Sequence, residues 1–146
     1  MADIKVMVVD DSLLTRKVLS DIIKNTEGLV LAGTANDGKY ALAKIPFLKP
    51  DVITMDVNMP KMDGITTLQE IMSRFPTPVI MVSAVTREAA AETIAALEAG
   101  AVDFVTKPET DSEIEEIQQI IVSKIKSAAG VRSEERRVGK ECRSRW

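Results

Sequence analysis

The chain has 146 residues, enough for one domain with a buried core and too few for two ordinary domains. Histidine is absent, which excludes Ser-His-Asp hydrolases, Cys-His proteases, histidine-ligated zinc sites and phosphohistidine carriers, and no apolar run could cross a membrane. Of the net charge of −3, residues 1–131 carry −6 and residues 132–146 carry +3, so the acidic body is a poor match for nucleic acid.

The N-terminal part of the chain predicts a strand followed by a helix. The run IKVMVV at 4–9 is rich in β-branched residues and too short for a helix, which favours a buried strand. Ser12 is the expected N-cap of the helix that follows, and Gly28 lies where the chain should leave it. The apolar residues of this helix fall on one face: Leu14, Val18, Leu19 and Ile22.

The alternation of strand and helix then repeats along the chain. Further strands are predicted at 29–35, 51–56, 79–83 and 103–107. The helices after them are marked by apolar residues at helical spacing: Ala41, Ile45 and Leu48; Ile65, Leu68, Met72 and Phe75; Ala90, Ile94, Leu97 and Ala101; and Ile114, Ile117, Ile121 and Ile125. We expect each of these faces to pack against the core.

The C-terminal segment differs in composition from the rest of the chain. Residues 132–146, RSEERRVGKECRSRW, show neither helical nor strand periodicity and contain clusters of like charge. We therefore predict a domain over 1–126 and a disordered tail over 127–146. This tail resembles vector-derived sequence, and a native basic linker is the alternative. The single cysteine cannot form an internal disulfide, so a cytoplasmic location is expected.

The order of the predicted elements indicates the fold class. Strands that are apolar throughout, each followed by a helix, predict a parallel sheet with helices on both faces. Right-handed crossovers leave two short arrangements, a flavodoxin-like order 2-1-3-4-5 and half of a dinucleotide-binding fold. The phosphate-binding glycine patterns of nucleotide folds are missing. We predict an α/β, flavodoxin-like, doubly wound five-stranded parallel sheet.

Polar residues stand at the carboxyl ends of four of the predicted strands. Asp10 and Asp11 follow the first strand, Asp56 ends the third, Ser83 ends the fourth and Lys107 ends the fifth. In a doubly wound sheet these ends meet at one edge, and ligands bind where the strand order reverses, between strands one and three. The five side chains are therefore expected to converge at one site.

Three carboxylates in one place predict a bound cation. Two unit charges about 4 Å apart repel by roughly 4 kcal/mol at an effective dielectric constant near 20. Such a cluster takes up protons, recruits a cation or remains solvated, and Mg²⁺ is the cation that suits a few carboxylates, a carbonyl and waters. A carboxylate nucleophile, Mg²⁺, a lysine and a hydroxyl together suit phosphoryl transfer.

Each of these residues, taken alone, also has a purely structural interpretation. Asp11 with Ser12 would cap a helix, Asp56 would begin a turn, Ser83 would be a loop hydroxyl and Lys107 a solvated charge. Phe104 would be the large apolar residue that a fifth strand needs in the core. Only the convergence of the polar residues favours the functional interpretation.

Four segments of the chain carry a resemblance to a known family. VVDDS, TMDVNMPKMDG, VIMVSA and GAVDFVTKP together resemble the receiver domain of two-component response regulators, over residues 3–126. The resemblance implies that Asp56 accepts a phosphoryl group from a sensor histidine kinase. It also implies that Asp56 and Asp11 bind Mg²⁺ directly, that Asp10 acts through water, and that the backbone carbonyl of Asn58 faces the ion.

The same resemblance implies how the signal leaves the site. Ser83 would donate a hydrogen bond to the phosphoryl oxygens, and Lys107 would pair with Asp56 or its phosphate. Pro108 would follow a cis peptide bond. Phe104 would change its packing on phosphorylation, so Ser83 and Phe104 are the expected switch residues. The surface formed by the fourth helix, fifth strand and fifth helix would then change.

Within the family, one branch is most similar. PTPVIMVSAVT and LEAGAVDFVTKP resemble the N-terminal receiver of the chemotaxis protein-glutamate methylesterase. The catalytic domain of that enzyme would need a histidine, so the chain is interpreted as a regulatory part and not as an enzyme. A magnesium-dependent phosphatase or phosphotransferase with an aspartate nucleophile is the alternative. It is disfavoured because haloacid-dehalogenase-type enzymes have D-x-D after the first strand and a cap over the substrate.

Overall fold

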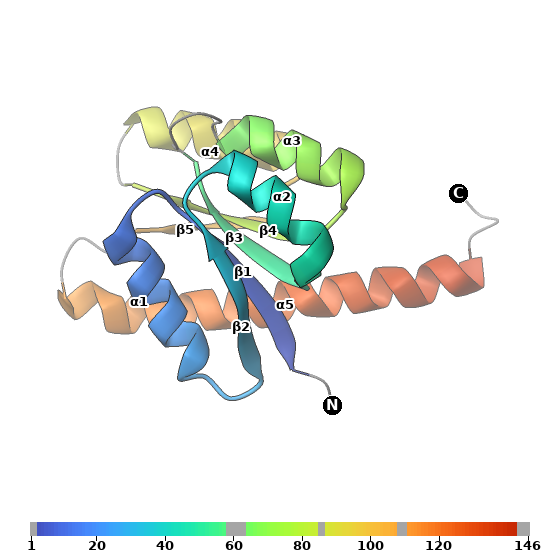
Figure 1. The fold of residues 1–146 in the computed structure, drawn as a ribbon, viewed down its shortest axis with the longest axis horizontal. Helices are drawn as coiled ribbons and strands as arrows, with labels where there is room; N and C mark the ends of the chain where they lie inside the picture. Colours follow the sequence, from blue (N-terminus) through green and yellow to red (C-terminus); the bar gives the residue numbers. More distant parts are fainter. Residues whose placement is uncertain (1–2, 58–63, 85–86, 108–110, 143–146) are drawn as a thin grey trace.

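A central parallel sheet organises the computed structural model, which describes residues 3–57, 64–84, 87–107 and 111–142 (Figure 1). The strands pair in the order β2-β1-β3-β4-β5, and every pair is parallel. Their bounds are β1 Ile4–Val9, β2 Leu29–Ala35, β3 Val52–Asp56, β4 Val79–Ser83 and β5 Asp103–Thr106. The flavodoxin-like order predicted from the sequence is confirmed.

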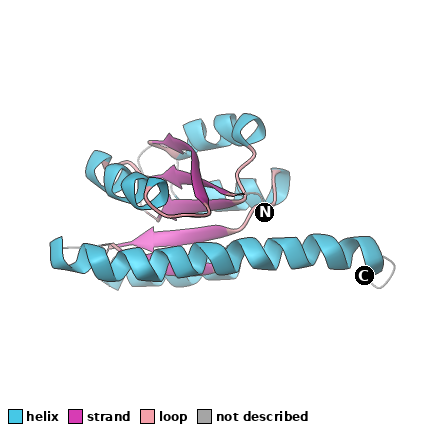
Figure 2. Ribbon diagram, turned by 90° about the horizontal axis from the view of Figure 1, so that it is seen from below, coloured by secondary structure: helices cyan, strands magenta, loops and turns pink. Residues whose placement is uncertain are grey.

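Helices cover both faces of the sheet (Figures 1 and 2). They are α1 Leu13–Lys24, α2 Gly38–Leu48, α3 Gly64–Arg74, α4 Arg87–Ala99 and α5 Asp111–Cys142. One core cluster joins the sheet to α1 and α5, and a second joins it to α2 and α3 with Ala96 of α4. Within the described ranges, no helix combines the length and apolar character needed to span a membrane.

Side-chain caps begin the helices that follow β1 and β2. The Ser12 hydroxyl accepts a hydrogen bond from the Thr15 N–H at 3.3 Å, as the sequence predicted. A carboxylate oxygen of Asp37 accepts one from the Tyr40 N–H at 2.9 Å. Both caps lie at the carboxyl end of the sheet, so the chain turns sharply into a helix directly beside the expected site.

Most of the apolar stripe predicted for α4 does not face the core, although Ala101, just after the helix, is buried there. Ile94 is 60 % exposed, whereas the side chain before it, Thr93, is buried and Ala96 is 0 % exposed. One residue corresponds to a rotation of about 100° around a helix, so the buried face of α4 lies beside the predicted one. Small side chains on that face allow α4 to approach α3 and β4 closely. The prediction that Ile94 and Leu97 belong to the core is wrong.

The last helix is longer than the sequence indicated. A disordered tail was predicted from residue 127, but α5 continues to Cys142 and projects beyond the sheet (Figure 1). Ala128 is buried and belongs to the same core cluster as Ile121 and Ile125, so the contact between α5 and the sheet extends past residue 126. The vector origin of residues 132–146 stays a prediction.

Candidate functional site

Three carboxylates meet at the carboxyl-end edge of the sheet. Asp10 follows β1 and Asp56 ends β3, the neighbouring strands between which the strand order reverses. One carboxylate oxygen of each of Asp10, Asp11 and Asp56 lies within 4.8 Å of those of the other two. Asp10 and Asp56 are 0 % and 4 % exposed, whereas Asp11 is exposed to solvent. The acids predicted to converge therefore form one cluster, open on the side of Asp11.

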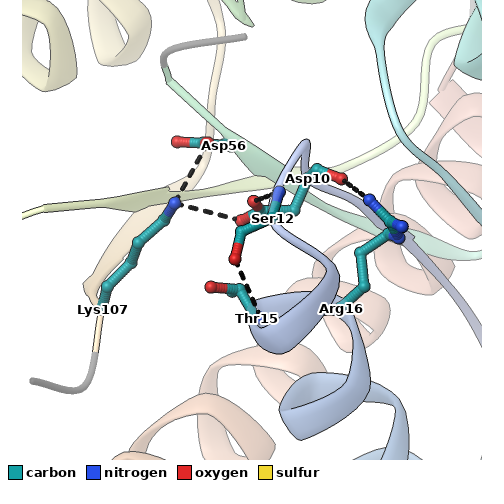
Figure 3. A network of polar contacts seen from close by, with 6 residues as sticks. All are labelled: Asp10, Ser12, Thr15, Arg16, Asp56 and Lys107. Atoms are coloured by element: carbon teal, nitrogen blue, oxygen red, sulfur yellow. Dashed lines mark hydrogen bonds and ion pairs between the residues drawn. The ribbon is translucent and has the colours of Figure 1, made fainter.

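Lys107 connects this cluster to the other half of the sheet (Figure 3). Its Nζ donates a hydrogen bond to Asp56 Oδ2 at 3.0 Å and lies 3.3 Å from Asp10 Oδ2. The backbone N–H of Lys107 donates to the carbonyl of Ser83 at 2.8 Å. Ser83 is buried at the end of β4, beside β3, so its carbonyl fixes the point from which the lysine side chain extends towards the acids.

Asp10 is held at several atoms, and one oxygen is left open. Its N–H donates to the Ala35 carbonyl at 3.1 Å, and its Oδ1 accepts from the Ser12 N–H at 2.8 Å. Its own carbonyl accepts from Arg16 Nη1 at 2.7 Å (Figure 3). Asp10 Oδ2 is buried and accepts no hydrogen bond from the described residues, although the Lys107 ammonium lies 3.3 Å from it. A buried carboxylate oxygen of this kind is suited to a cation or to a water bound to one.

The ionisation of the cluster is strongly perturbed. Burial raises the pKa of Asp56 to about 7, with help from the charge of Asp10 and a hydrogen bond with Asp11, and against the effect of Lys107. Burial also raises the pKa of Asp10, although the Ser12 N–H and Lys107 oppose it. Burial alone would lower the pKa of Lys107, but the two carboxylates raise it overall. The lysine therefore stays charged, and its single charge does not compensate the acids.

These features fit a hard divalent cation. The donors are carboxylate oxygens from two neighbouring strands, one of them buried without a hydrogen bond, and burial together with the charge of Asp10 raises the pKa of Asp56. Mg²⁺ prefers such oxygen ligands and retains waters where the protein leaves the site open, here on the exposed side of Asp11. The residues present can therefore hold the ion that the sequence predicted.

Gly64 keeps the backbone close to the phosphoacceptor candidate. It begins α3, and its N–H donates to the Val57 carbonyl at 2.9 Å. A Cβ at this position would lie 2.4 Å from the Asp56 carbonyl oxygen, closer than any side chain tolerates. The chain that leaves β3 at Asp56 therefore returns to it at residue 64, and only glycine permits this return.

The remaining predicted residues have different outcomes. Asn58 and Pro108 lie outside the described residues. Phe104 is 42 % exposed, so the interpretation of this residue as part of the core is wrong. Its ring lies 5.2 Å from the Lys124 ammonium, on the outer side of β5. The sequence analysis did not single out Arg16 or Lys124, because a lysine or arginine on an amphipathic helix has no spacing that distinguishes it from a solvated charge.

Comparison with known proteins identifies the family. The family model described as the response regulator receiver domain matches residues 6–119. The chain belongs to this family. As a receiver domain it is similar to the response regulator domain of Thermotoga maritima CheB, with a TM-score of 0.80 and 47 % identity, covering 88 % of this chain and 97 % of that one.

Two further relatives extend the comparison. The protein-glutamate methylesterase/protein-glutamine glutaminase of Pyrococcus horikoshii is 50 % identical over 130 residues, which are 88 % of this chain and 35 % of the relative. The receiver domain thus spans about a third of the length of such relatives. A chain of the CheX–CheY–BeF3–Mg²⁺ complex from Borrelia burgdorferi has a TM-score of 0.65 and 34 % identity, over 83 % of this chain and 90 % of that one.

Proposed function

We propose that this receiver domain accepts a phosphoryl group on Asp56 from a sensor histidine kinase, with Mg²⁺ as cofactor, and thereby regulates a chemotaxis methylesterase. The observation that carries the proposal is the Asp56 carboxylate, buried beside two further carboxylates and 3.0 Å from the Lys107 ammonium. A longer protein with a C-terminal methylesterase domain agrees with the length of the curated relatives. We place this receiver in the cytoplasm with its kinase.

The reaction requires the charged form of Asp56. One carboxylate oxygen attacks the phosphorus atom, the P–O bond forms, and the P–N bond of the phosphohistidine breaks. The imidazole leaves with the electron pair of that bond. Since the pKa of Asp56 is about 7, a proton occupies the nucleophile part of the time near neutral pH. Any interaction that favours its charged form therefore increases the fraction of reactive receiver.

Asp10, Asp11 and Asp56 are the side chains that would hold Mg²⁺, with Asp10 acting through water and the carbonyl of Asn58 completing the set. Bound Mg²⁺ would neutralise negative charge on the carboxylates and on the incoming phosphoryl oxygens. The related Borrelia CheX–CheY complex with BeF3 and Mg²⁺ supports the same pairing of phosphoryl mimic and ion in this chain.

Lys107 and Ser83 would respond to the new phosphoryl group. The Lys107 ammonium, already 3.0 Å from Asp56 Oδ2, is the cation available to pair with a phosphoryl oxygen. The Ser83 hydroxyl would donate a second hydrogen bond to it. Both residues adjoin β5, where Phe104 lies, so their movement would be transmitted to the surface of α4, β5 and α5.

Labelling with acetyl phosphate and Mg²⁺ tests the proposal. We expect intact-mass spectra to show at most one added phosphoryl group, located at Asp56 by peptide analysis and lost in Asp56→Asn, which keeps the shape but not the nucleophile. Asp21→Asn, on the exposed face of α1, is the matched control and should label normally. Equal labelling of Asp56→Asn, or a label on Ser83, would contradict the mechanism, and many turnovers per chain would favour a phosphotransferase.

Beryllofluoride with Mg²⁺ tests the switch separately. It should shift amide resonances of α4, β5 and α5 in the wild type and leave Asp56→Asn unchanged. Normal labelling at Asp56 without any shift on that surface would leave the chemistry intact and refute the switch.

A further inference from the structure

Arg16 makes a contact with the site that the proposed chemistry does not use. It belongs to the start of α1, and its Nη1 donates to the carbonyl oxygen of Asp10 at 2.7 Å (Figure 3). The side chain is half-buried, and it reaches back over the turn that joins β1 to α1. The Asp10 carbonyl belongs to the planar peptide unit that leads into Asp11. A contact that fixes this oxygen therefore also fixes the direction in which Asp11 leaves the strand.

We propose that Arg16 is a positioning residue of the acidic site. It holds the peptide between Asp10 and Asp11, so that Asp10 Oδ2 and the Asp11 carboxylate face the same cation. The other two hydrogen bonds of Asp10 support this function but do not replace it. The Ala35 carbonyl holds the end of the strand and the Ser12 N–H holds Oδ1, whereas Arg16 alone among the described side chains holds the peptide oxygen.

The position of Arg16 in α1 argues against a purely helical explanation. Cations near the N-terminus of a helix oppose the helix dipole, and α1 has no acidic residue in its first turn that could pair with one. Arg16 is the fourth residue of the helix. Its presence there is therefore not favoured by the electrostatics of α1, and its contact with Asp10 is the interaction that explains it.

Two possible roles of Arg16, as a nearby positive charge or as a positioning residue, predict opposite effects of its removal on Mg²⁺ binding. If Arg16 acted only as a nearby positive charge, its removal would reduce the repulsion of Mg²⁺ and strengthen binding slightly. If Arg16 positions the acids, its removal weakens binding, because the ligands lose their common orientation. Lys17 provides the matched control, since it is the next residue of α1, carries the same charge and is exposed.

The test compares wild type, Arg16→Ala, Arg16→Lys and Lys17→Ala by amide resonances during Mg²⁺ titration. The inference rests on the proposed function only for its metal-binding part. We expect the dissociation constant of Arg16→Ala to rise by about tenfold, Arg16→Lys to recover most of the affinity, and Lys17→Ala to bind as the wild type or slightly tighter. Identical titrations of Arg16→Ala and Lys17→Ala would overturn the inference.

A second readout needs no metal. The Ser12 N–H donates to Asp10 Oδ1, so its hydrogen exchange reports how firmly Asp10 is held. In metal-free protein this amide should exchange faster in Arg16→Ala than in Lys17→Ala, while the amides of Leu19 and Ile23 in the body of α1 remain unchanged. Unchanged Ser12 exchange in Arg16→Ala would overturn the inference, whether or not the wild type binds Mg²⁺. A wild type that does not bind Mg²⁺ would instead refute the proposed function.

Discussion

Two lysine–aspartate pairs in this molecule have similar geometry and opposite electrostatics. Lys107 lies 3.0 Å from Asp56 at the acidic site, and Lys124 lies 2.8 Å from Asp103 where α5 crosses β5. In both pairs the ammonium donates directly to a carboxylate oxygen. Yet the pKa of Asp56 is raised to about 7, whereas the pKa of Asp103 is lowered below its usual value. The distance to the cation does not decide the ionisation of these carboxyl groups.

The surroundings of the two aspartates explain the difference. The Asp56 side chain is 6 % exposed and has Asp10 as a neighbour, so burial and like charge outweigh Lys107. The Asp103 side chain is 41 % exposed. The modest burial of Asp103 raises its pKa less than the hydrogen bonds from Lys124 and from the Phe104 N–H lower it. In the inner pair, Lys107 and Asp56, the lysine does not offset the burial and the like charge that act on the aspartate. In the outer pair, Lys124 and Asp103, the lysine and the Phe104 N–H together stabilise the charged aspartate.

The outer pair has a structural function that the inner pair lacks. Lys124 also donates to the Phe104 carbonyl at 2.8 Å, and its ammonium lies 5.2 Å from the ring of that residue. These contacts fasten α5 to β5 beneath an aromatic side chain that is exposed to solvent. One pair thus lies at the site proposed to take a cation and a phosphoryl group, and the other holds the surface that is proposed to respond.

The largest expected effect is the pH dependence of stability. The folded state binds the Asp56 proton more tightly than the unfolded chain does, so the free energy of unfolding falls as pH rises from 3.8 to about 7. A shift of this size corresponds to at most about 4 kcal/mol. Urea unfolding between pH 5 and 8.5 without Mg²⁺ measures the effect. We expect Asp56→Asn to remove most of the slope and to be more stable than the wild type at pH 8.

Mg²⁺ provides the control for this experiment, because it competes with the proton for the carboxylates. Saturating Mg²⁺ should stabilise the wild type at pH 8 and have little effect at pH 5 or on Asp56→Asn. A slope of the same size in Asp56→Asn would show that Asp56 does not carry the effect. The pH dependence due to the outer pair has the opposite sign. Its stabilisation is present above the usual pKa of Asp103 and is lost only as pH falls below that value.

An intermediate effect is expected from Lys107→Met, which keeps the apolar stem and removes the charge. At pH 8 the two buried carboxylates lose their cation. Because Lys107 is itself partly exposed, we expect a loss of about 2 kcal/mol in the free energy of unfolding, the size of a hydrogen bond to a charged group. At pH 5 the loss should be smaller, because protons replace the missing charge. If Asp56 is the phosphoacceptor, we expect it still to be labelled in this variant, whereas the response of α4, β5 and α5 should be weakened. Equal losses at both pH values would contradict the assigned role of Lys107.

The smallest effect is expected from the outer pair. Because both its side chains are partly exposed, Lys124→Met and Asp103→Asn should each change the free energy of unfolding by less than about 1 kcal/mol. A double-mutant cycle at pH 7 and at two salt concentrations measures the coupling between them. If this coupling energy exceeded that between Lys107 and Asp56, the conclusion that the outer pair contributes less to stability would be wrong.

The sequence predicted the sheet and the meeting of the acids because both follow from strand order. Once the strands run parallel in the order 2-1-3-4-5, residues that end β1 and β3 must be neighbours. The spacing of apolar residues in the sequence does not show how deeply each of them is buried. Ile94 has the spacing of a core residue but is exposed, since small residues beside it face α3 and the sheet.

Some side-chain contacts across the fold were likewise beyond the sequence. The strand order and the family resemblance placed Lys107 beside Asp56, but nothing in the pattern shows that Lys124 holds Asp103 and Phe104. Arg16 resembles any charged residue of an amphipathic helix until its hydrogen bond to the Asp10 carbonyl is seen. These differences depend on three-dimensional distances and on burial, which periodicity does not encode.

The most direct test is an NMR titration of the aspartate side-chain carboxyl carbons in metal-free protein. We predict that Asp56 titrates near pH 7 while Asp103 titrates below 3.8, although each has a lysine within hydrogen-bonding distance. Added Mg²⁺ should lower the Asp56 midpoint and leave that of Asp103 unchanged. A midpoint for Asp56 at or below its usual value of 3.8 would contradict the conclusion that burial and like charge outweigh Lys107 at this site.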